Sequence, residues 1–389
     1  MHDVLQEIRS APARQQPDWA DRDQVDRVVR ELETRRPLVG AHDVRTLRSL
    51  LAHVAQGRAL IVQAGDCAED PAECGAVDVS RKRALLDLLA GTVRMAAHKP
   101  VLRVGRIAGQ YCKPRSNPVE QVGGRRLTPY RGHMVNLPEP TEERRRPDPR
   151  RILDCYASAD LIVNRLGWWG RREPLLEAGV WTSHEALLLD YEIPMLRHTS
   201  AGGLLLTSTH FPWIGERTRQ LDGAHVAMLR RVVNPVACKV GPQMTPDEAV
   251  ALCEQLDPRR EPGRLTLISR MGADLVTRRL PALVRAVRAA GHPVIWLCDP
   301  MHGNTITTPD GLKTRLLDTV IAEVRGFQWA VNTSGGVAGG LHLETTPDAV
   351  TECVPCESWT DRVAHKYTTL CDPRLNPQQA VQVAAAWQG

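Results

Sequence analysis

From about residue 59 onward, the chain alternates short apolar runs with longer stretches of helical periodicity. Residues 1–57 differ, because apolar positions there recur at helical spacing, as in ADRDQVDRVVRELETRR, until RRPLVG breaks the pattern. A short apolar run between turn signals is typical of a buried strand. The runs predicted as strands are 60–64 (LIVQA), 101–107 (VLRVGRI), 204–208 (LLLTS), 236–240 (VACKV), 265–269 (LTLIS), 294–297 (VIWL), 341–344 (LHLE) and 367–370 (YTTL).

Helical segments separate these runs. They are predicted at 80–99, 219–232, 245–256, 274–291, 312–326 and 376–387. Strands that alternate with helices in this way predict an α/β fold, a (β/α)8 TIM barrel at 58–389 with an N-terminal helical extension at 1–57. The alternative is a doubly wound open sheet, but no G-x-G-x-x-G motif follows any of the predicted strands.

Composition narrows the class of protein. The 389 residues include no apolar run of about 18 or more, and the polar N-terminus lacks the features of a signal peptide, so a cytoplasmic protein without membrane contact is expected. The ten cysteines are then expected to be thiols. The formal net charge of +5 is spread along the chain, so nucleic-acid binding is not expected. A small anionic substrate suits this charge better.

The active site of a TIM barrel is built from the C-terminal ends of its strands. In this chain those ends carry reactive side chains of two kinds. The predicted ends deliver Cys67, Arg106, Glu216, Arg217, Lys239, Arg270, Asp299, His302, Glu344, Cys371 and Asp372. The sixth, seventh, eighth and first predicted strands end in acids, an imidazole and a thiol, whereas each of the second to fifth ends with a cation. We therefore expect an anionic wall and a cationic wall that face one cleft.

The anionic wall predicts a metal site, because its strands would be consecutive around a closed barrel. Cys67, His302, Glu344 and Asp372 combine a thiolate, an imidazole and two carboxylates, a mixed ligand set for one divalent transition metal. We place Mn2+ and Co2+ first, and Fe2+ and Zn2+ also suit these ligands.

The cationic wall predicts a substrate with several negative charges. Arg106, Arg217, Lys239 and Arg270 would face one cleft, which favours a small molecule that carries both a phosphate and a carboxylate. Taken singly, these residues have simpler structural interpretations, because Lys239 and Arg270 would also serve in structural salt bridges and a strand-end cysteine usually packs in the core. The coincidence of so many reactive strand ends carries the prediction.

Two further cysteine features are weaker signals. CVPC (353–356) has C-x-x-C spacing but no second pair at zinc-finger spacing, so ordinary loop thiols are expected. Cys371 adjoins Asp372, and oxidation of Cys67 with Cys371 would remove a metal ligand. A regulatory disulfide between these two residues is therefore a hypothesis that the sequence leaves open.

The motifs at these strand ends closely resemble those of class II (plant-type) 3-deoxy-D-arabino-heptulosonate 7-phosphate (DAHP) synthases, in a short form. They occur in the family's order from about residue 60 to 376: QAGDCAED, VGRIAGQYCKPRS, TSHEALLLDYE, WIGERTRQLDGAH, CKVGP, LISRMGAD, CDPMHGNT, LHLETT and TLCDPRLN. The resemblance implies a metal-dependent (β/α)8 barrel that condenses phosphoenolpyruvate with erythrose 4-phosphate to DAHP and phosphate. This reaction is the entry to the shikimate pathway and to aromatic amino acid biosynthesis.

The resemblance also implies residue roles, on the positions that match the family's motifs. The metal ligands would be Cys67, His302, Glu344 and Asp372, and phosphoenolpyruvate would be bound by Arg106, Glu216, Arg217, Lys239 and Arg270. Arg115 and Ser116 would bind the phosphate of the aldose. The candidate catalytic residues are Lys239, as a proton donor, Glu216, which would direct water, and His302. A homo-oligomer is expected, and a chorismate mutase is a candidate partner.

One loop departs from the family pattern and keeps alternatives open. The family commonly reads R-G-D there, with a glycine soon after the asparagine, whereas this chain reads YRGHMVNLPEP, with His133 and Leu137. A synthase that uses a modified aldose phosphate is one alternative, such as an amino-DAHP synthase in the secondary metabolism of antibiotics. A metal-dependent aldolase of another type would not need so many cations. An alternative of another class is a non-catalytic partner of a chorismate-pathway enzyme, which the intact ligand positions disfavour.

Overall fold

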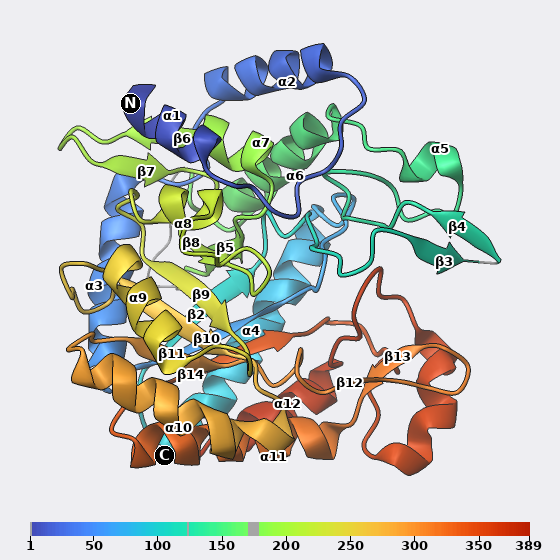
Figure 1. The fold of residues 1–389 in the computed structure, drawn as a ribbon. Coiled ribbons are helices and arrows are strands. Elements are labelled where there is room, and N and C mark those ends of the chain that lie inside the picture. The colour runs from blue at the N-terminus through green and yellow to red at the C-terminus, as the bar shows by residue number, and fades with distance from the viewer. Residues whose placement is uncertain (1, 123, 170–178) are drawn as a thin grey trace. The chain divides into compact units, whose positions relative to one another are not determined.

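The computed structural model describes residues 2–122, 124–169 and 179–389. Its main sheet is a closed barrel of eight strands in the order β1-β14-β11-β10-β9-β8-β5-β2, with helices between successive strands (Figure 1). The strands are β1 (Leu60–Gly65), β2 (Val101–Arg106), β5 (Trp181–Glu185), β8 (Phe211–Ile214), β9 (Val236–Val240), β10 (Leu265–Ser269), β11 (Ile295–Cys298) and β14 (Val337–Glu344). The prediction of a TIM barrel is confirmed.

Two of the eight predicted barrel strands are wrong, and two barrel strands escaped prediction. Residues 204–206 form β7 (Leu204–Leu206), but this strand pairs with β6 (Leu196–His198) in an antiparallel hairpin that is not part of the barrel. Residues 367–370 form no strand. The barrel uses β5 and β8 instead, whose sequences WTSHE and FPWI lack the aliphatic run that predicts a buried strand.

Strand β5 is buried although its sequence is polar, because its polar groups find partners inside the protein. Thr182, Ser183 and His184 are all fully buried. Thr182 Oγ1 lies 2.8 Å from His210 Nδ1, and His184 Nε2 lies 2.8 Å from Glu192 Oε1. A buried polar group is tolerated when it is hydrogen-bonded, so hydrophobic pattern alone cannot identify such a strand.

The chain divides into two compact units. The first unit comprises Met1–Val44, Ala68–Val79 and Ile107–Asn234, and the second comprises Arg45–Cys67, Ser80–Arg106 and Pro235–Gly389. The first unit contains β5 and β8, which pair in parallel. The second contains β1, β2, β9, β10, β11 and β14, which also pair in parallel.

The register of the second unit brings three strand ends level. Gly65, the last residue of β1, pairs with Arg106 on one side and with Glu344 on the other. Gly65 has a φ of +151°, and a Cβ atom at this position would lie 2.6 Å from the carbonyl oxygen of Arg106. Only glycine permits the backbone of β1 to lie this close to Arg106 at the point where the strand ends, two residues before Cys67.

Three of the four helices predicted after residue 240 start within one residue of the predicted position. The four helices are α9 (Pro246–Leu256), α10 (Ala273–Ala289), α11 (Leu317–Thr333) and α12 (Pro377–Ala385), with a 3-10 helix η2 (Glu357–Lys366). Thr245 with Glu248, and Asn376 with Gln379, form capping boxes at α9 and α12. The helix predicted from residue 312 starts later, because 313–315 form β13 (Lys313–Arg315), which pairs with β12 (Thr305–Thr307).

The N-terminal residues are helical, as predicted, in α1 (His2–Ser10), α2 (Arg22–Thr34) and α3 (Ala41–Ala55). Helices α3 and α4 (Ala76–Ala97) contain residues of both units. The first unit also contains β3 (Glu120–Val122), β4 (Arg125–Leu127), α5 (Glu142–Arg145), α6 (Arg151–Arg165), α7 (Leu189–Glu192), η1 (Ile193–Met195) and α8 (Ala224–Leu229). Within the described residues, no helix is both long and apolar enough to cross a membrane.

Candidate active site

Three of the predicted metal ligands come together in the second unit. The Sγ atom of Cys67 and carboxylate oxygens of Glu344 and Asp372 all lie within 4.8 Å of one another. Cys67 follows β1, Glu344 ends β14, and Asp372 lies in the loop before α12. Bond lengths of about 2.0–2.3 Å place two donors on one ion up to about 4.5 Å apart, so these atoms fit one coordination sphere with little movement.

His302, the fourth predicted ligand, lies beside this cluster. Its Nε2 atom is 3.1 Å from Glu344 Oε1, and its Nδ1 atom is 2.8 Å from Asp299 Oδ2. A carboxylate on one ring nitrogen orients the imidazole and leaves the other nitrogen to serve as a ligand. Burial alone would raise the pKa of Asp299, but the neighbouring His302 and Lys239 hold it well below its ordinary value.

Lys239 connects the predicted cationic wall to the same residues. Its Nζ atom donates to Asp299 Oδ2 at 2.8 Å and lies 3.3 Å from His302 Nδ1. Burial lowers the pKa of Lys239, although the attraction of Asp299 acts in the opposite direction. A buried ammonium whose pKa is lowered transfers its proton more readily than an exposed lysine.

In the second unit, the cations pair with the acids rather than lining a separate wall. Arg106 NH2 lies 3.0 Å from Glu344 Oε1, and Arg315 NH1 lies 2.9 Å from Glu344 Oε2. All three side chains are buried. Burial alone would lower the pKa of Arg315, but the charge of Glu344 raises it above its ordinary value. The expectation of two separated walls is therefore wrong here, because buried charges are stable only beside opposite charges.

Asp372 also pairs with a cation, and Arg270 contacts the segment that carries His302. Lys313 Nζ lies 2.8 Å from Asp372 Oδ1. Arg270 NH2 donates to the backbone oxygen of His302 at 3.1 Å, so a predicted substrate ligand touches the segment that carries a predicted metal ligand. The two predicted groups form one interleaved network.

Sequence reasoning missed the residues that support the cluster. Arg374 lies 2.7 Å from Asp66 Oδ1 and 2.9 Å from Glu352 Oε1, and Lys82 lies 2.9 Å from Asp66 Oδ2. Burial alone would raise the pKa of Asp66, but Lys82 and Arg374 lower it. Asp66 precedes Cys67, so this network fixes the segment that presents the thiol. The charged residues in GDCAED and CDPRLN could have indicated a network of ion pairs near the cluster, but the sequence does not show which residues pair.

The other four predicted residues belong to the first unit and are Arg115, Ser116, Glu216 and Arg217. Arg217 NH2 donates to Ser116 Oγ at 2.5 Å, so two motifs that lie far apart in the sequence meet. Arg115 NH2 lies 3.1 Å from Glu120 Oε1. These contacts bring together a residue predicted for phosphoenolpyruvate and a residue predicted for the aldose phosphate.

Glu216 has one oxygen engaged and one available. Its Oε1 atom accepts from Arg219 NH2 at 2.9 Å. Its Oε2 atom is buried and has no hydrogen-bond partner within the described parts of the chain. A buried acceptor of this kind suits a group that binds water or a substrate hydroxyl.

His133, where the family pattern is broken, is held in the first unit as a buried, uncharged ring. Its Nδ1 atom lies 2.7 Å from Tyr130 Oη, and its backbone oxygen accepts from Arg151 Nε at 2.6 Å. Burial lowers the pKa of His133, although the charge of Asp70 opposes this effect. The aspartate that the family commonly has would place a negative charge at this position.

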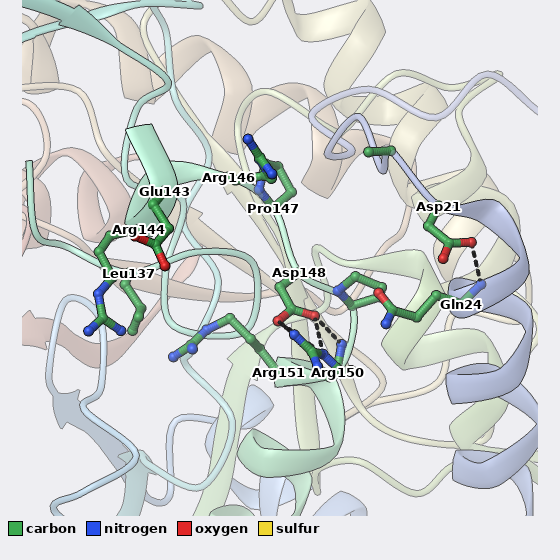
Figure 2. Close-up of a pocket in the computed structure, with 12 residues that line it drawn as sticks. Asp21, Gln24, Leu137, Glu143, Arg144, Arg146, Pro147, Asp148, Arg150 and Arg151 are labelled. Atoms are coloured by element: carbon green, nitrogen blue, oxygen red, sulfur yellow. Dashed lines mark hydrogen bonds and ion pairs between the residues drawn. The ribbon is translucent and has the colours of Figure 1, made fainter. Parts of the chain in front are cut away.

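The same loop borders a surface cavity of about 450 Å3 (Figure 2). Its lining includes Leu137, Arg144, Arg146, Asp148, Arg150 and Arg151, with Asp21 and Gln24 from the start of α2. Arg150 is neutralised by Asp148 at 2.8 Å, and Arg144 and Arg146 are exposed. These features describe a solvated, charged groove rather than a closed ligand site.

All ten cysteines are free thiols. Burial raises the pKa of Cys353 to about 12, which argues against a reactive thiol at this position of the CVPC segment. Cys371 is only partly buried. A regulatory disulfide between Cys67 and Cys371 stays a prediction.

Comparison with known proteins agrees with the geometry. The family model described as "Class-II DAHP synthetase family" matches residues 4–171 and 167–387. A "Probable phospho-2-dehydro-3-deoxyheptonate aldolase" of Pseudomonas fluorescens is 53% identical over 390 residues, which cover 100% of this chain and 98% of that protein. A "Phospho-2-dehydro-3-deoxyheptonate aldolase" of Streptomyces coelicolor is 40% identical over 425 residues, which cover 97% of this chain and 94% of that protein.

A solved structure supports the fold. The phospho-2-dehydro-3-deoxyheptonate aldolase of Francisella tularensis SCHU S4 matches with a TM-score of 0.55 and 12% identity, and the match covers 94% of this chain and 97% of that one. The family model spans nearly all of the sequence, and the Pseudomonas relative is similar over its full length. This chain therefore belongs to the class-II DAHP synthetase family and is an enzyme of that family.

Proposed function

We propose that this enzyme condenses phosphoenolpyruvate with erythrose 4-phosphate and water to give DAHP and phosphate. Family membership supports the reaction, and the cluster of Cys67, Glu344 and Asp372 with His302 beside it is the observation that carries the proposal. A relative that had lost catalysis would not be expected to keep such a buried, charged ligand set, because it costs stability.

The residues present fit a divalent transition metal. Cys67, His302, Glu344 and Asp372 would hold it, with Asp299 orienting His302. Mn2+ and Co2+ are the proposed ions, and Fe2+ and Zn2+ also suit these donors. When bound, the metal would supply Lewis acidity to the carbonyl oxygen of the aldose.

The cations are proposed to bind the two substrates. Arg106, Lys239 and Arg270 in the second unit would neutralise the carboxylate and phosphate of phosphoenolpyruvate, together with Arg217 in the first. Ser116, with Arg115, would bind the phosphate of the aldose. The hydrogen bond between Arg217 and Ser116 supports this assignment, because it places the two groups of the first unit beside each other.

In the proposed chemistry, a carbon–carbon bond forms between C3 of phosphoenolpyruvate and the aldehyde carbon. The aldehyde oxygen takes up a proton, for which Lys239 is the proposed donor, because its buried ammonium lies beside Asp299. Water adds at C2, where positive charge develops, and phosphate then departs. Glu216 is proposed to direct this water through its unengaged Oε2 atom.

The deciding experiment measures phosphoenolpyruvate consumption with erythrose 4-phosphate and with other aldose phosphates. We expect consumption with erythrose 4-phosphate, its loss with a chelator, and its return when Mn2+ or Co2+ is added. If no aldose phosphate supports consumption, the synthase proposal is overturned. A marked preference for a modified aldose phosphate would support the amino-DAHP alternative, which the names of the relatives do not favour.

We also propose that the enzyme is a homo-oligomer, with a chorismate mutase as a candidate partner. Light scattering on the eluting protein, with and without an added mutase, tests both points. A monomer that shows no change in mass with the mutase would contradict them.

A further inference from the structure

Glu323 is a buried carboxylate of α11 that the proposed metal site and substrate contacts do not use. Its side chain is fully buried in the second unit. Oε1 accepts from the backbone nitrogens of Met271 at 3.1 Å and Gly272 at 2.9 Å. Oε2 accepts from Asn304 Nδ2 at 2.6 Å. Both oxygens are therefore engaged by donors from other segments.

These donors belong to the two loops that carry Arg270 and His302. Asn304 adds two bonds of its own, since its Oδ1 accepts from Ala273 N at 3.0 Å and its Nδ2 donates to Pro300 O at 2.8 Å. Arg270 itself donates to the backbone oxygen of His302. Glu323 and Asn304 thus tie the loop after β10 to the loop after β11.

The two loops touch so closely that a side chain cannot separate them. A Cβ atom on Gly303 would lie 2.3 Å from the backbone nitrogen of Gly272, and Gly272 has a φ of +84°. The separation of the loops is therefore set by direct backbone contact and by the hydrogen bonds to Glu323.

The contacts require a carboxylate and not merely a polar side chain of the same size. A glutamine offers one acceptor oxygen, and its amide group would face either the amide of Asn304 or the two backbone N–H groups, all of which are donors. Asn304 cannot reverse its own amide without losing the bond from Ala273. Burial and the charge of Asp299 raise the pKa of Glu323, whereas the hydrogen bonds from Gly272, Asn304 and Met271 act in the opposite direction, because they stabilise the charged form.

We propose that Glu323 is a positioning residue that holds the Arg270 loop and the His302 loop in one arrangement, so that the site for phosphoenolpyruvate and the site for the metal depend on each other. The inference rests on the proposed roles of Arg270 and His302. It implies that loss of Glu323 weakens phosphoenolpyruvate binding and metal binding together. Binding of the aldose phosphate, assigned to residues of the first unit, should not change.

The test compares Glu323→Gln with the unmodified enzyme. The dissociation constant of Mn2+ is measured without substrates, and the KM values of both substrates are measured at saturating metal. We expect the metal constant and the KM of phosphoenolpyruvate to rise about tenfold to a hundredfold, as for other residues that support metal ligands, with the KM of the aldose phosphate unchanged. Glu323→Asp, which keeps two acceptor oxygens, should recover part of the loss.

Asp257→Asn is a matched control. Asp257 is also a buried carboxylate of the second unit, and its Oδ1 accepts from Glu261 N at 3.0 Å. This substitution should lower Tm and leave all three constants unchanged. If Glu323 had only a structural role, Glu323→Gln would behave in the same way as this control.

A folded Glu323→Gln variant with normal metal affinity and a normal KM for phosphoenolpyruvate would overturn the proposal. If that variant does not fold, Asn304→Ala replaces it, because it removes the donor to Oε2, and unchanged constants there overturn the proposal equally. Failure of the proposed function looks different, since the unmodified enzyme would then consume no phosphoenolpyruvate. The metal constant, measured without substrates, would still test the role of Glu323.

Discussion

The proposed metal cluster of the second unit and the proposed aldose-phosphate segment of the first unit are built differently. Cys67 and Glu344 are fully buried, and Glu344 lies between two buried arginines. The side chain of Arg115, by contrast, is 18% exposed, and its ion-pair partner Glu120 is 28% exposed. The position that departs from the family pattern, His133, also lies in the first unit.

This difference indicates which residues of the enzyme tolerate substitution and which do not. Buried charges that are held by fixed partners cannot move without large cost, so the chemistry is tied to the network around Glu344. Loop residues whose ion-pair partners are partly exposed, as Glu120 is, change with less effect on the fold. We therefore expect substitutions in the buried cluster of the second unit to act on metal binding and turnover. Substitutions at Ser116 and His133 in the first unit should act on the affinity and choice of the aldose.

Cys67→Ser should have the largest effect. The serine hydroxyl is a poorer ligand than a thiolate, so metal affinity and activity should both fall at least about a hundredfold, while the thermal unfolding curve changes little. Metal titration and the phosphoenolpyruvate assay measure this. Cys356→Ser is the control, because Cys356 contacts Ser358 outside the cluster. A Cys67→Ser enzyme with full activity and bound metal would show that this strand end is only packing.

Lys239→Ala should also lower activity strongly, but unlike Cys67→Ser it should spare metal binding. It removes the proposed proton donor and leaves Asp299 without its ammonium partner, so kcat should fall about a hundredfold to ten-thousandfold while the metal still binds. Lys99→Ala, at an exposed position, should behave as the unmodified enzyme. Normal turnover of Lys239→Ala would exclude Lys239 from the mechanism.

Ser116→Ala should have a smaller and more selective effect. It removes one hydroxyl from the proposed phosphate site and the bond to Arg217, so the KM of the aldose phosphate should rise about fivefold, the equivalent of one hydrogen bond. The metal affinity serves as the internal control, because Ser116 belongs to the first unit and the metal ligands to the second. A rise in the metal dissociation constant of similar size would contradict the contrast between the two regions.

His133→Asp should have the smallest effect on rate and act on substrate choice. A carboxylate would replace a neutral ring that lies beside Tyr130, so the ratio of kcat/KM between erythrose 4-phosphate and other aldose phosphates should shift by about tenfold or less. Competition assays with paired aldose phosphates measure the ratio. An unchanged ratio would separate His133 from the selection of the aldose.

The sequence predicted most of the barrel, and the reason is local. β1, β9 and β10 are short apolar runs whose burial is satisfied by aliphatic side chains, so their pattern is visible along the chain. β5 is buried through hydrogen bonds such as that between His184 and Glu192, which no pattern reveals. The predicted number of eight strands was right because two wrongly predicted strands offset two that were missed. Glu216 accordingly follows β8 and not the predicted run at 204–208.

By itself, the sequence determined the alternation of strands and helices, and it placed reactive side chains such as Cys67 and Glu344 at strand ends, because both depend on residues close together in the chain. Tertiary structure decided which charges pair. Arg106 meets Glu344 across 238 positions and Asp66 meets Arg374 across 308, and such pairs depend on distances that no local pattern contains. The role inferred for Glu323 rests on the same kind of contact, between segments that only the folded chain brings together.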